Sequence, residues 1–327
     1  MKPRIYIDGQ AGTTGLQIRE RLAPRRDITL LEIESSRRKD PTARTELLRS
    51  ADVAILCLPD DASREAVTLA GDAPVRLLDA STAHRVADGW VYGLPELAPE
   101  QRAAIRGAAR VSNPGCYPTG VILLLRPLVD AGLLAHDAAI TVHALSGYTG
   151  GGRPMIERWE DATTALGTLP FEAPYALDRE HKHVAEMTRY SGLVHRPQFV
   201  PAVGPFRCGM RTEIPLHAAL LPSGVSAARL HEALAGRYAD EAFVRVHPFR
   251  NEVSADERAF DPRAANGTNR IDLWVLPSPL GHVLLVATLD NLGKGAGGAA
   301  VQNLNLMLGV DEARGLEPGA PGSSAAA

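Results

Sequence analysis

Short apolar runs alternate with amphipathic stretches in the first third of the chain. Strands are predicted at residues 4–8, 28–33, 52–59 and 75–80, and helical spacing is found at 16–22 and 61–70. The run at 52–59 is apolar nearly throughout, which is typical of a parallel strand that is buried on both faces of a sheet. Strands that alternate with helices indicate a doubly wound parallel sheet, a Rossmann-like α/β fold.

The pattern changes after residues 121–134, a long apolar run of helical length. Further strands are predicted at 138–145, 212–221, 244–249, 270–276 and 282–289. The last three of these strands, 244–249, 270–276 and 282–289, are joined by turns without long helices, so we expect a second, α+β domain with a largely antiparallel sheet. A last helix is predicted at 300–308, and the Gly, Pro, Ser and Ala residues of 315–327 predict a disordered tail.

The composition argues against several classes of protein. The chain has 327 residues, of which 45% are hydrophobic, enough for two domains or one large one. A net charge of −3 does not favour nucleic acid as a partner. Three widely spaced cysteines form no disulfide framework or zinc motif, and no apolar run resembles a signal peptide or a membrane span. We therefore expect a cytoplasmic protein without metal, nucleic acid or membrane partners.

A glycine-rich turn, residues 9–15, joins the first strand to the first helix. The glycines have GxxGxxG spacing, and Thr13 and Thr14 precede the last of them. A strand, a glycine turn and a helix in succession are typical of a nucleotide-binding site, where N–H groups at the start of the helix bind pyrophosphate. The spacing differs from the usual GxGxxG, and an ordinary tight turn is the alternative.

The second strand leads into two serines and three cations, residues 35–39. Ser35, Arg37 and Arg38 suit the 2′-phosphate of NADP, because arginine binds phosphate through two parallel hydrogen bonds. A carboxylate from Glu32 or Glu34 could instead hold the ribose 2′-hydroxyl of NAD. This region favours NADP but leaves NAD open.

Other segments lie where ligands bind on such a fold. Pro59 and Ser81 follow predicted strands, and ligands bind beyond the carboxyl ends of parallel strands. A second glycine-rich segment, residues 290–299, contains Lys294 and leads into the last helix, so it also suits a phosphate.

Cys116 lies in a turn between Pro114 and Pro118, directly before the long apolar run. We expect it at or beside a helix N-terminus, where N–H groups and the helix dipole favour negative charge. Such a position lowers the pKa of a cysteine, and the thiolate is the nucleophile. A buried structural cysteine is the alternative, which we do expect for Cys57 within its apolar strand.

Other side chains suit acid–base chemistry and anion binding. His181 and His183 could move protons near a reactive thiol; HxH spacing can also ligate a metal, but no third ligand cluster accompanies it. Residues 146–153 resemble a flexible glycine loop that ends in Arg153, which could wrap an anionic substrate or serve as a bare connection. Two more cations, Arg207 and Arg211, precede a predicted strand.

Together these motifs resemble those of the N-acetyl-γ-glutamyl-phosphate reductases, in the shorter of the two forms of that family. The resemblance rests on residues 7–16, 92–97, 113–119, 146–153 and 290–295, which span nearly the whole chain. It implies NADPH-dependent reductive dephosphorylation of an acyl phosphate in arginine biosynthesis, with N-acetyl-L-glutamate 5-semialdehyde as the product.

The resemblance also implies a domain organisation and an oligomer. Residues 1–115 with 294–327 would form the NADP-binding domain, because the last helix of the family returns to the first domain. Residues 116–293 would form the substrate and oligomerisation domain, and a homodimer or homotetramer is expected.

The family's nucleophile falls on Cys116, and its histidine motif falls on His181 and His183, with Glu180 where glycine is common. We favour His181 as the acid–base group, although the choice between the two stays open. Cys116 would form a thioester that accepts hydride. Asn113 and backbone N–H groups would stabilise the oxyanion.

The resemblance and the motifs together give two sets of candidate ligand-binding residues. Those expected to bind NADP(H) are Gly9, Gly12, Thr13, Thr14, Gly15, Ser35, Arg37, Arg38, Pro59, Ser81, Asn291, Lys294 and Gly295. Those expected to bind the substrate are Arg85, Ser146, Gly147, Arg153, Arg207 and Arg211. The alternatives are the same chemistry on aspartyl phosphate or a carrier-linked aminoadipyl phosphate, and a non-catalytic NADP-binding sensor.

Overall fold

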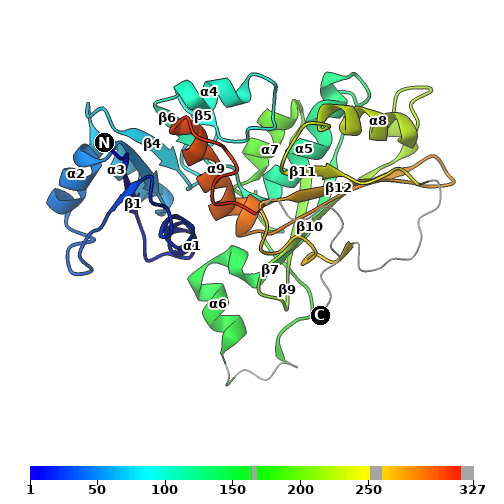
Figure 1. Cartoon of the computed structure of the whole chain (residues 1–327). Helices are drawn as coiled ribbons and strands as arrows, with labels where there is room; N and C mark the ends of the chain where they lie inside the picture. The colour runs from blue at the N-terminus through cyan, green and yellow to red at the C-terminus, as the bar shows by residue number, and fades with distance from the viewer. Residues whose placement is uncertain (162, 164–167, 251–259, 318–327) are drawn as a thin grey trace. The chain divides into compact units, whose positions relative to one another are not determined.

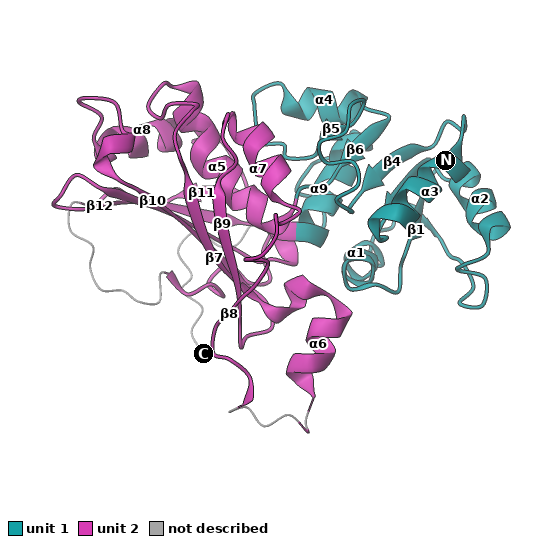
Figure 2. Ribbon diagram, turned by 180° about the vertical axis from the view of Figure 1, so that it is seen from behind, with its two compact units in different colours: residues 1–114, 296–316 teal, residues 115–295, 317–327 magenta. Residues whose placement is uncertain are grey.

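The computed structural model describes residues 1–161, 163, 168–250 and 260–317. The chain divides into two compact units (Figures 1 and 2). Unit 1 comprises Met1–Pro114 and Ala296–Leu316, and unit 2 comprises Gly115–Gly295 together with Glu317. Within the described residues, no helix is both long and apolar enough to cross a membrane.

Unit 1 contains a six-stranded sheet in which every neighbouring pair of strands is parallel, in the order β2-β1-β3-β4-β6-β5. This confirms the doubly wound sheet expected from the alternating apolar runs. The elements are β1 (Arg4–Asp8), α1 (Thr13–Leu22), β2 (Thr29–Leu31), α2 (Pro41–Ser50), β3 (Val53–Leu56), α3 (Asp60–Ala70), β4 (Arg76–Asp79), β5 (Val91–Tyr92), α4 (Gln101–Gly107), β6 (Arg110–Ser112) and α9 (Gly298–Met307).

Helices cover both faces of this sheet. On one face α2 contacts α3, and on the other α9 contacts α1 and α4. The first of these faces is filled by apolar side chains that are almost fully buried, among them Tyr6, Leu48, Ala54, Leu56, Ala66 and Leu77. The carboxyl ends of β1, β3 and β4 therefore meet at one edge of a rigid sheet, which places the polar residues that follow them close together.

The helix α9 belongs to unit 1 although it lies at the end of the sequence. It is buried along its whole length yet carries three amide side chains. Gln302 donates to the Glu96 carboxylate, Asn303 donates to the Gly93 carbonyl, and Asn305 donates to two backbone carbonyls. Since buried amides need partners, the bonds of Gln302 and Asn303 fix α9 against the first part of the chain, and those of Asn305 hold the segment that follows the helix.

Unit 2 contains a seven-stranded mixed sheet in the order β11-β12-β13-β10-β7-β9-β8. The pairs β11–β12 and β7–β9 are parallel and the other four are antiparallel, so the expected largely antiparallel sheet is confirmed. The elements are α5 (Cys116–Asp130), β7 (Thr141–Gly147), a 3-10 turn (Tyr148–Gly151), α6 (Arg153–Glu160), β8 (Ala173–Pro174), α7 (Val184–Ser191), β9 (Gln198–Gly204), β10 (Met210–Leu216), a 3-10 turn (Ala218–Leu220), α8 (Ala227–Arg237), β11 (Val244–Val246), β12 (Ile271–Pro277), β13 (Val283–Leu289) and a π-helical turn (Gly293–Gly297).

The central helix of unit 2 is α5, which contacts α7, α8, β10 and β13. Most of its residues are apolar and buried, as expected of a core helix, and only Arg126 and Asp130 form a partly exposed ion pair on it. Gly120 allows the close approach to the sheet, because a Cβ there would lie 3.3 Å from both Thr212 Oγ1 and Ala287 Cβ. The sheet therefore fixes the axis of the helix that begins at Cys116.

Several local predictions were wrong. Residues 146–153 do not form a flexible loop: β7 continues to Gly147, a 3-10 turn follows, and α6 begins at Arg153. The helix α8, between β10 and β11, was not predicted. The predicted strand at 212–221 starts at Met210 and already ends at Leu216.

The predicted disordered tail begins too early at residue 315. Leu316 is 6% exposed, and the Glu317 carbonyl accepts a hydrogen bond of 2.7 Å from the Asn269 N–H. Residues 318–327 lie outside the described residues. The functional assignment of the predicted domains, 1–115 with 294–327 and 116–293, stays a prediction.

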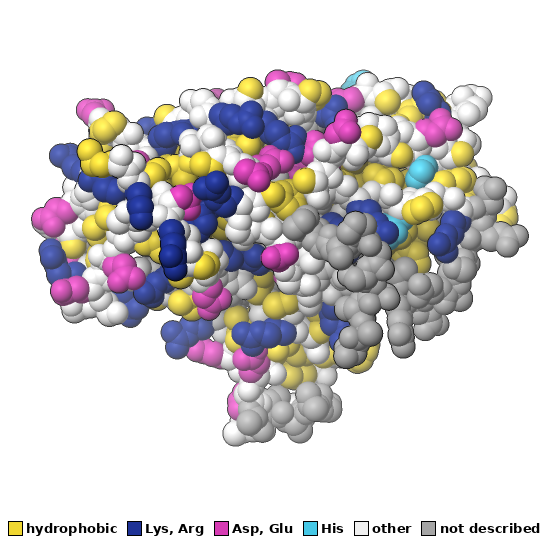
Figure 3. Space-filling view, in the orientation of Figure 1, with side chains coloured by type: hydrophobic (Ala, Val, Ile, Leu, Met, Phe, Trp, Pro, Cys, Tyr) yellow, Lys and Arg dark blue, Asp and Glu magenta, His cyan; other side chains and the backbone are white. Residues whose placement is uncertain are grey.

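Charges of both signs are distributed over the surface. On the face shown in Figure 3, Lys and Arg side chains are interspersed with Asp and Glu side chains. This face therefore offers a polyanion no extended field of one sign.

Candidate active site

Cys116 is the first residue of α5, and Gly115 is the N-cap with extended backbone angles, φ −75° and ψ 153°. This confirms the predicted place at a helix N-terminus. No side chain caps the helix, and Pro118, in its first turn, has no N–H. The backbone N–H groups and the dipole at the start of α5 favour an anion beside the half-buried Cys116.

Two neighbours fix the position of this helix start. The Glu186 carboxylate, on α7 and only 1% exposed, accepts a hydrogen bond of 3.1 Å from the Gly115 N–H. A Cβ added at Gly295 would lie 2.8 Å from Cys116 Cβ, so a glycine is needed there to leave room for the cysteine. Gly295 was predicted to bind a cofactor phosphate, but its observed neighbour is Cys116.

The rings of both predicted histidines lie near the ring of Tyr117, the residue after Cys116. The ring of Tyr117 lies 6.0 Å from that of His181 and 5.8 Å from that of His183, measured between centroids. The two histidine rings are 4.7 Å apart, and Phe199 of β9 packs 5.1 Å from both Tyr117 and His181. His183 is buried, at 6% exposed, whereas His181 is half-buried.

A second tyrosine completes this cluster. The Tyr175 hydroxyl lies 3.3 Å from the Tyr117 hydroxyl and 3.3 Å from His181 Nε2. Burial, and to a smaller extent the charge of Cys116, raise the pKa of Tyr175 to about 12. Burial is also the main cause that raises the pKa of Tyr117 well above its usual value. Both phenols therefore stay protonated at neutral pH.

The other two thiols differ from Cys116. Burial, with smaller contributions from Asp79 and Asp8, raises the pKa of the Cys57 thiol to about 12. Burial also raises the pKa of Cys208, whose thiol lies 3.7 Å from Thr149 Oγ1. Neither thiol lies at the start of a helix, so Cys116 is the candidate nucleophile.

The predicted substrate residues of unit 2 are not equally placed. Ser146 is buried and its hydroxyl donates to the Gly147 carbonyl at 3.1 Å, and Gly147 packs so tightly that a Cβ would lie 2.5 Å from the Arg207 carbonyl oxygen. Arg153, with 86% of its side chain exposed, pairs with Glu157, and Arg207 pairs with Glu160.

Arg211 is less exposed than the other two arginines of unit 2. It bonds Glu213 at 2.9 Å and the Phe260 carbonyl. All three guanidinium groups are thus bonded within unit 2, and a substrate would have to compete with these partners.

Two predicted cofactor residues of unit 2 are buried and have internal partners. The Asn291 side chain accepts from the Gly209 N–H at 2.8 Å and donates to Thr149 Oγ1 at 3.0 Å. Lys294 is fully buried, and its Nζ lies 5.6 Å from the centre of the Phe243 ring. These contacts favour a structural role for both residues over contact with a phosphate.

The glycine turn of unit 1 has the geometry of a nucleotide-binding loop. Gly9 has a φ of +88°, and a Cβ there would lie 2.2 Å from the Cys57 carbonyl oxygen. A Cβ at Gly15 would lie 2.4 Å from the Gly9 carbonyl oxygen. Gly12 is the N-cap of α1, no side chain caps that helix, and Thr13 and Thr14 form its first turn. The N–H groups of α1 can therefore receive a pyrophosphate.

The turn after β2 presents the residues predicted to select NADP. Ser35, Arg37 and Arg38 are exposed there. Arg37 lies 3.3 Å from Asp40, the N-cap residue of α2. The competing carboxylate of Glu32 pairs with Arg19 at 2.8 Å, so it is turned toward α1.

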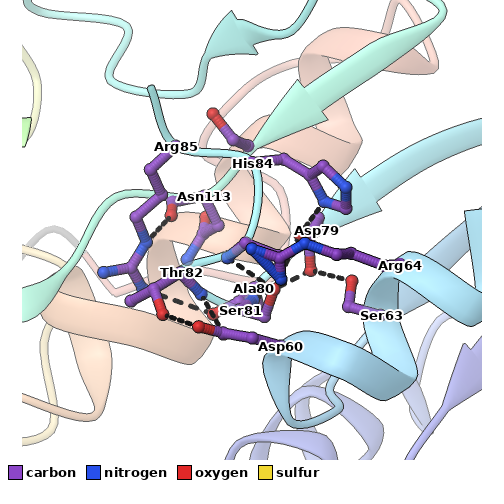
Figure 4. Close-up of polar contacts among 12 residues, drawn as sticks. Asp60, Ser63, Arg64, Asp79, Ala80, Ser81, Thr82, His84, Arg85 and Asn113 are labelled. Carbon is purple, nitrogen blue, oxygen red and sulfur yellow. Dashed lines mark hydrogen bonds and ion pairs between the residues drawn. The ribbon is translucent and has the colours of Figure 1, made fainter. Parts of the chain in front are cut away.

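Polar side chains cluster at the carboxyl ends of β3 and β4, with Asp79 at their centre (Figure 4). Asp79 is fully buried and accepts hydrogen bonds from Ser63 and Ser81 and pairs with His84 Nδ1 at 2.6 Å. Beside it the Asp60 carboxylate, which follows Pro59, accepts from the N–H and the hydroxyl of Thr82. These bonds fix the loop that contains Ser81 on the sheet edge where dinucleotides bind.

Arg85 and Asn113 lie in the same region of unit 1 but have structural partners. Arg85 is 8% exposed and donates to the carbonyls of Asn113 and Ala80. The Asn113 amide donates to the Ala296 carbonyl at 3.0 Å and accepts from Asn303 at 3.0 Å. These contacts favour a structural role for both residues, in which they hold the segment before Cys116. They do not favour substrate binding by Arg85 or oxyanion binding by Asn113.

Sequence reasoning missed four residues of the cysteine cluster: Tyr117, Tyr175, Glu186 and Phe199. Tyr117 is part of the cysteine motif, and Glu186 follows His183 by one helical turn, so spacing could have indicated both. No sequence signal marks Tyr175 or Phe199, which reach the cluster through β8 and β9. Within the described residues, no group of three or more His, Cys, Asp or Glu side chains could hold a metal ion.

Comparison with known proteins matches both units. Residues 4–105 match the family described as "Semialdehyde dehydrogenase, NAD binding domain", and residues 116–291 match "Semialdehyde dehydrogenase, dimerisation domain". A relative from Burkholderia cenocepacia named N-acetyl-gamma-glutamyl-phosphate reductase is 51% identical over 95% of this chain and 99% of its own. One from Nostoc sp., named N-acetyl-gamma-glutamyl-phosphate reductase 2, is 51% identical over 96% and 99%.

Solved structures share the fold. An aspartate semialdehyde dehydrogenase from Francisella tularensis superposes with a TM-score of 0.71 over 94% of this chain and 100% of its own, at 13% sequence identity.

Proposed function

The chain belongs to the N-acetyl-γ-glutamyl-phosphate reductases, and on that premise we propose that it forms a thioester on Cys116 during catalysis. It reduces N-acetyl-γ-glutamyl phosphate with NADPH to N-acetyl-L-glutamate 5-semialdehyde, a step of arginine biosynthesis. The observation that supports the thioester most directly is the place of Cys116 at the first position of α5, with both histidine rings packed on Tyr117.

The residues of unit 1 fit NADP(H). Gly9 and Gly15 allow the tight turn before α1, because a Cβ at either position would clash with a backbone carbonyl oxygen, and the first turn of α1 can receive the pyrophosphate. Ser35, Arg37 and Arg38 would hold the 2′-phosphate, and the loop around Ser81 would border the cofactor. When bound, NADPH supplies the hydride that reduces the thioester.

Acyl transfer uses residues of unit 2. The Cys116 thiol first loses its proton to solvent, and the thiolate then attacks the γ-carbonyl carbon; the bond from that carbon to the phosphate oxygen breaks, and phosphate leaves with the electron pair of that bond. The dipole of α5 stabilises the thiolate before attack. Glu186 holds the Gly115 N–H and Gly295 leaves room for the cysteine, so the sulfur is already positioned when the substrate binds.

Oligomerisation and location are also part of the proposal. The match of residues 116–291 to a dimerisation domain supports a homodimer or homotetramer built through unit 2. The three free cysteines suit the reducing cytoplasm. Light scattering at micromolar concentration should give at least twice the monomer mass, and a monomer mass would contradict the proposal.

An activity assay tests the function. The protein is incubated with NADP, phosphate and N-acetylglutamate semialdehyde, and NADPH absorbance should rise. Aspartate semialdehyde in the same assay should give less than about a hundredth of that rate, because a pocket built for a larger polar group rejects an analogue that lacks it. A faster rate with aspartate semialdehyde would point to another acyl phosphate, and no rate with either would favour a sensor.

A further inference from the structure

The hydrogen bonds around His181 define which of its nitrogens carries the proton. The backbone N–H of His183 donates to His181 Nδ1 at 3.2 Å, so Nδ1 is an acceptor and has no proton. A neutral imidazole with an unprotonated Nδ1 carries its proton on Nε2. Nε2 lies 3.3 Å from the Tyr175 hydroxyl, so the histidine donates to the tyrosine oxygen. Both ring nitrogens of His181 therefore have a hydrogen-bond partner within this cluster.

The Ala202 carbonyl, the last acceptor, determines which group donates in each hydrogen bond of the series. The Tyr117 hydroxyl lies 3.3 Å from the Ala202 carbonyl, which can only accept, so Tyr117 donates to it. Tyr175 then donates its single proton to the Tyr117 oxygen. The chain runs from His181 through Tyr175 and Tyr117 to Ala202, and every donor along it points the same way.

Among these hydrogen-bonded groups, the Tyr175 hydroxyl is the one that can exchange its acceptor, Tyr117, for another. Tyr117 is 3% exposed and enclosed by other rings, whereas Tyr175 is half-buried. All three bonds of the chain are long for hydrogen bonds, as is common for catalytic groups without bound substrate. Tyr117 directly follows Cys116 at the start of α5, and its hydroxyl lies 3.3 Å from that of Tyr175, so both tyrosines belong to the cluster beside the thiol.

The backbone next to Tyr175 is strained. Ala176 has a φ of +53°, and among the described residues it is the only non-glycine residue with a positive φ. This region is unfavourable for an L-residue, and such strain clusters at functional sites. The strain is consistent with a side chain that is held in place for a purpose other than packing.

We propose that Tyr175 is a catalytic residue of this reaction, and that His181 is a positioning residue that acts through it. The Tyr175 hydroxyl turns from Tyr117 to the substrate's γ-carbonyl oxygen and donates a hydrogen bond as negative charge develops there. His181 donates from Nε2 to the tyrosine oxygen and so strengthens the tyrosine as a donor.

This inference rests on the proposed function. Tyr175 only donates a hydrogen bond: no O–H bond of the tyrosine breaks, and phosphate leaves from the thiolate attack as in the acyl-transfer step.

The test is a double-variant cycle with Tyr175→Phe, His181→Asn and the two combined, assayed with NADP, phosphate and N-acetylglutamate semialdehyde. Removing one oxyanion donor lowers kcat roughly 100-fold or more, which we expect for Tyr175→Phe. NADPH affinity and the alkylation rate of Cys116 should stay within about threefold of wild type, because the cofactor site and the thiol are untouched. Asparagine keeps an acceptor for the His183 N–H but loses the bond to Tyr175.

Since His181 acts through Tyr175, His181→Asn should lower kcat in the wild-type background and change it less than about threefold in the Tyr175→Phe background. His181→Gln, which can place an N–H near the tyrosine oxygen, should retain more activity than His181→Asn. The structural control is Tyr238→Phe, which removes a buried hydroxyl bonded to the Leu123 carbonyl of α5. This variant should melt at a lower temperature but keep its kcat.

Two results would overturn the inference. One is a Tyr175→Phe protein with kcat within about threefold of wild type, and the other is an equal loss from His181→Asn in both backgrounds. Failure of the proposed function is distinguishable, because then wild type would not turn over the semialdehyde or Cys116→Ser would remain active.

Discussion

At the scale of single residues, the three thiols differ by burial and by position. Cys116 is half-buried at the start of a helix, whereas burial raises the pKa of Cys57 to about 12 and also raises that of Cys208. Because the thiolate is the reactive form, the enclosed thiols are almost fully protonated and inert at neutral pH.

We therefore expect iodoacetamide at pH 7.5 to modify Cys116 alone. Peptide mass spectrometry should locate the label there, and the labelling rate of Cys57 should rise only as the pH approaches 12. Cys116→Ser protein is the control and should stay unlabelled. Equal labelling of Cys57 and Cys116 at neutral pH would contradict this account of the thiols.

A single glycine should be as important to turnover as the side chains around it. Gly295→Ala would place a Cβ 2.8 Å from Cys116 Cβ and 3.0 Å from Leu289 Cδ1, so the cysteine must shift. A shift of about 1 Å can lower turnover roughly 100-fold. Steady-state kinetics should show this loss in kcat.

The matched control is Gly236→Ala, in α8, where nothing lies within 4 Å of an added Cβ. That change should leave kcat unaltered and stabilise the helix by up to about 1 kcal/mol. If both alanine variants kept full activity, Gly295 would not position the nucleophile.

At the scale of elements, the strand β12 carries a buried charge cluster that should make stability depend on pH. Asp272 is 2% exposed and lies 2.8 Å from both Arg270 Nε and His247 Nε2. Burial alone would raise the pKa of this carboxyl, but His247 and Arg270 outweigh burial and hold the pKa below its usual range. An aspartate in an unfolded chain has a pKa of about 3.9.

The ionised Asp272 therefore stabilises the fold above about pH 4, and this contribution is lost as the pH falls through the lower native pKa. Asp272→Asn should be less stable than wild type in urea at pH 7, and the difference should shrink below about pH 4. Glu157→Gln, which removes an exposed pair with Arg153, is the control and should show little difference at either pH. A gap for Asp272→Asn that widens in acid would refute the assignment.

The turn after β2 should determine the choice of cofactor. Arg37 already forms an ion pair with Asp40, so Arg38 is the better candidate for binding the 2′-phosphate. A charge-assisted hydrogen bond contributes about 1.5–3 kcal/mol, so Arg38→Ala should weaken NADPH binding roughly ten- to 150-fold. Binding of NADH, which has no 2′-phosphate, should not change.

Fluorescence titration with both cofactors measures this, with Arg37→Ala and the double variant alongside. A double variant that binds NADPH as tightly as wild type would show that these arginines do not read the phosphate.

At the scale of the whole molecule, the sequence predicts those helices and strands that are determined by the local pattern of apolar and polar residues. The parallel strands of unit 1 could be predicted because each is a continuous apolar run, and the helix start at Cys116 because a proline-glycine turn precedes an apolar run. The partners of buried polar groups could not be predicted. Asn291, Lys294 and Arg85 are typical ligand-binding residues by type, yet the structure encloses them among protein partners.

The rest of the site depends on contacts between elements that are distant in sequence. Tyr175 reaches His181 and Tyr117 only because β8 pairs with β9, and β9 pairs with β7 in the sheet beneath α5. The helix α6 was missed because its glycine-rich approach resembles a loop. Local pattern therefore indicated the candidate nucleophile, whereas the hydrogen-bonded tyrosines beside it could be found only from the fold.

The central claim is that Cys116 carries the acyl group, and intact-protein mass spectrometry tests it most directly. Wild-type protein is mixed with N-acetyl-γ-glutamyl phosphate in the absence of NADPH, so that the acyl-enzyme accumulates. We predict one added N-acetylglutamyl group per chain, located on the Cys116 peptide and released by hydroxylamine, and no adduct on Cys116→Ser protein that still binds NADPH. An equal adduct on the serine variant, or full turnover by that variant, would contradict the account.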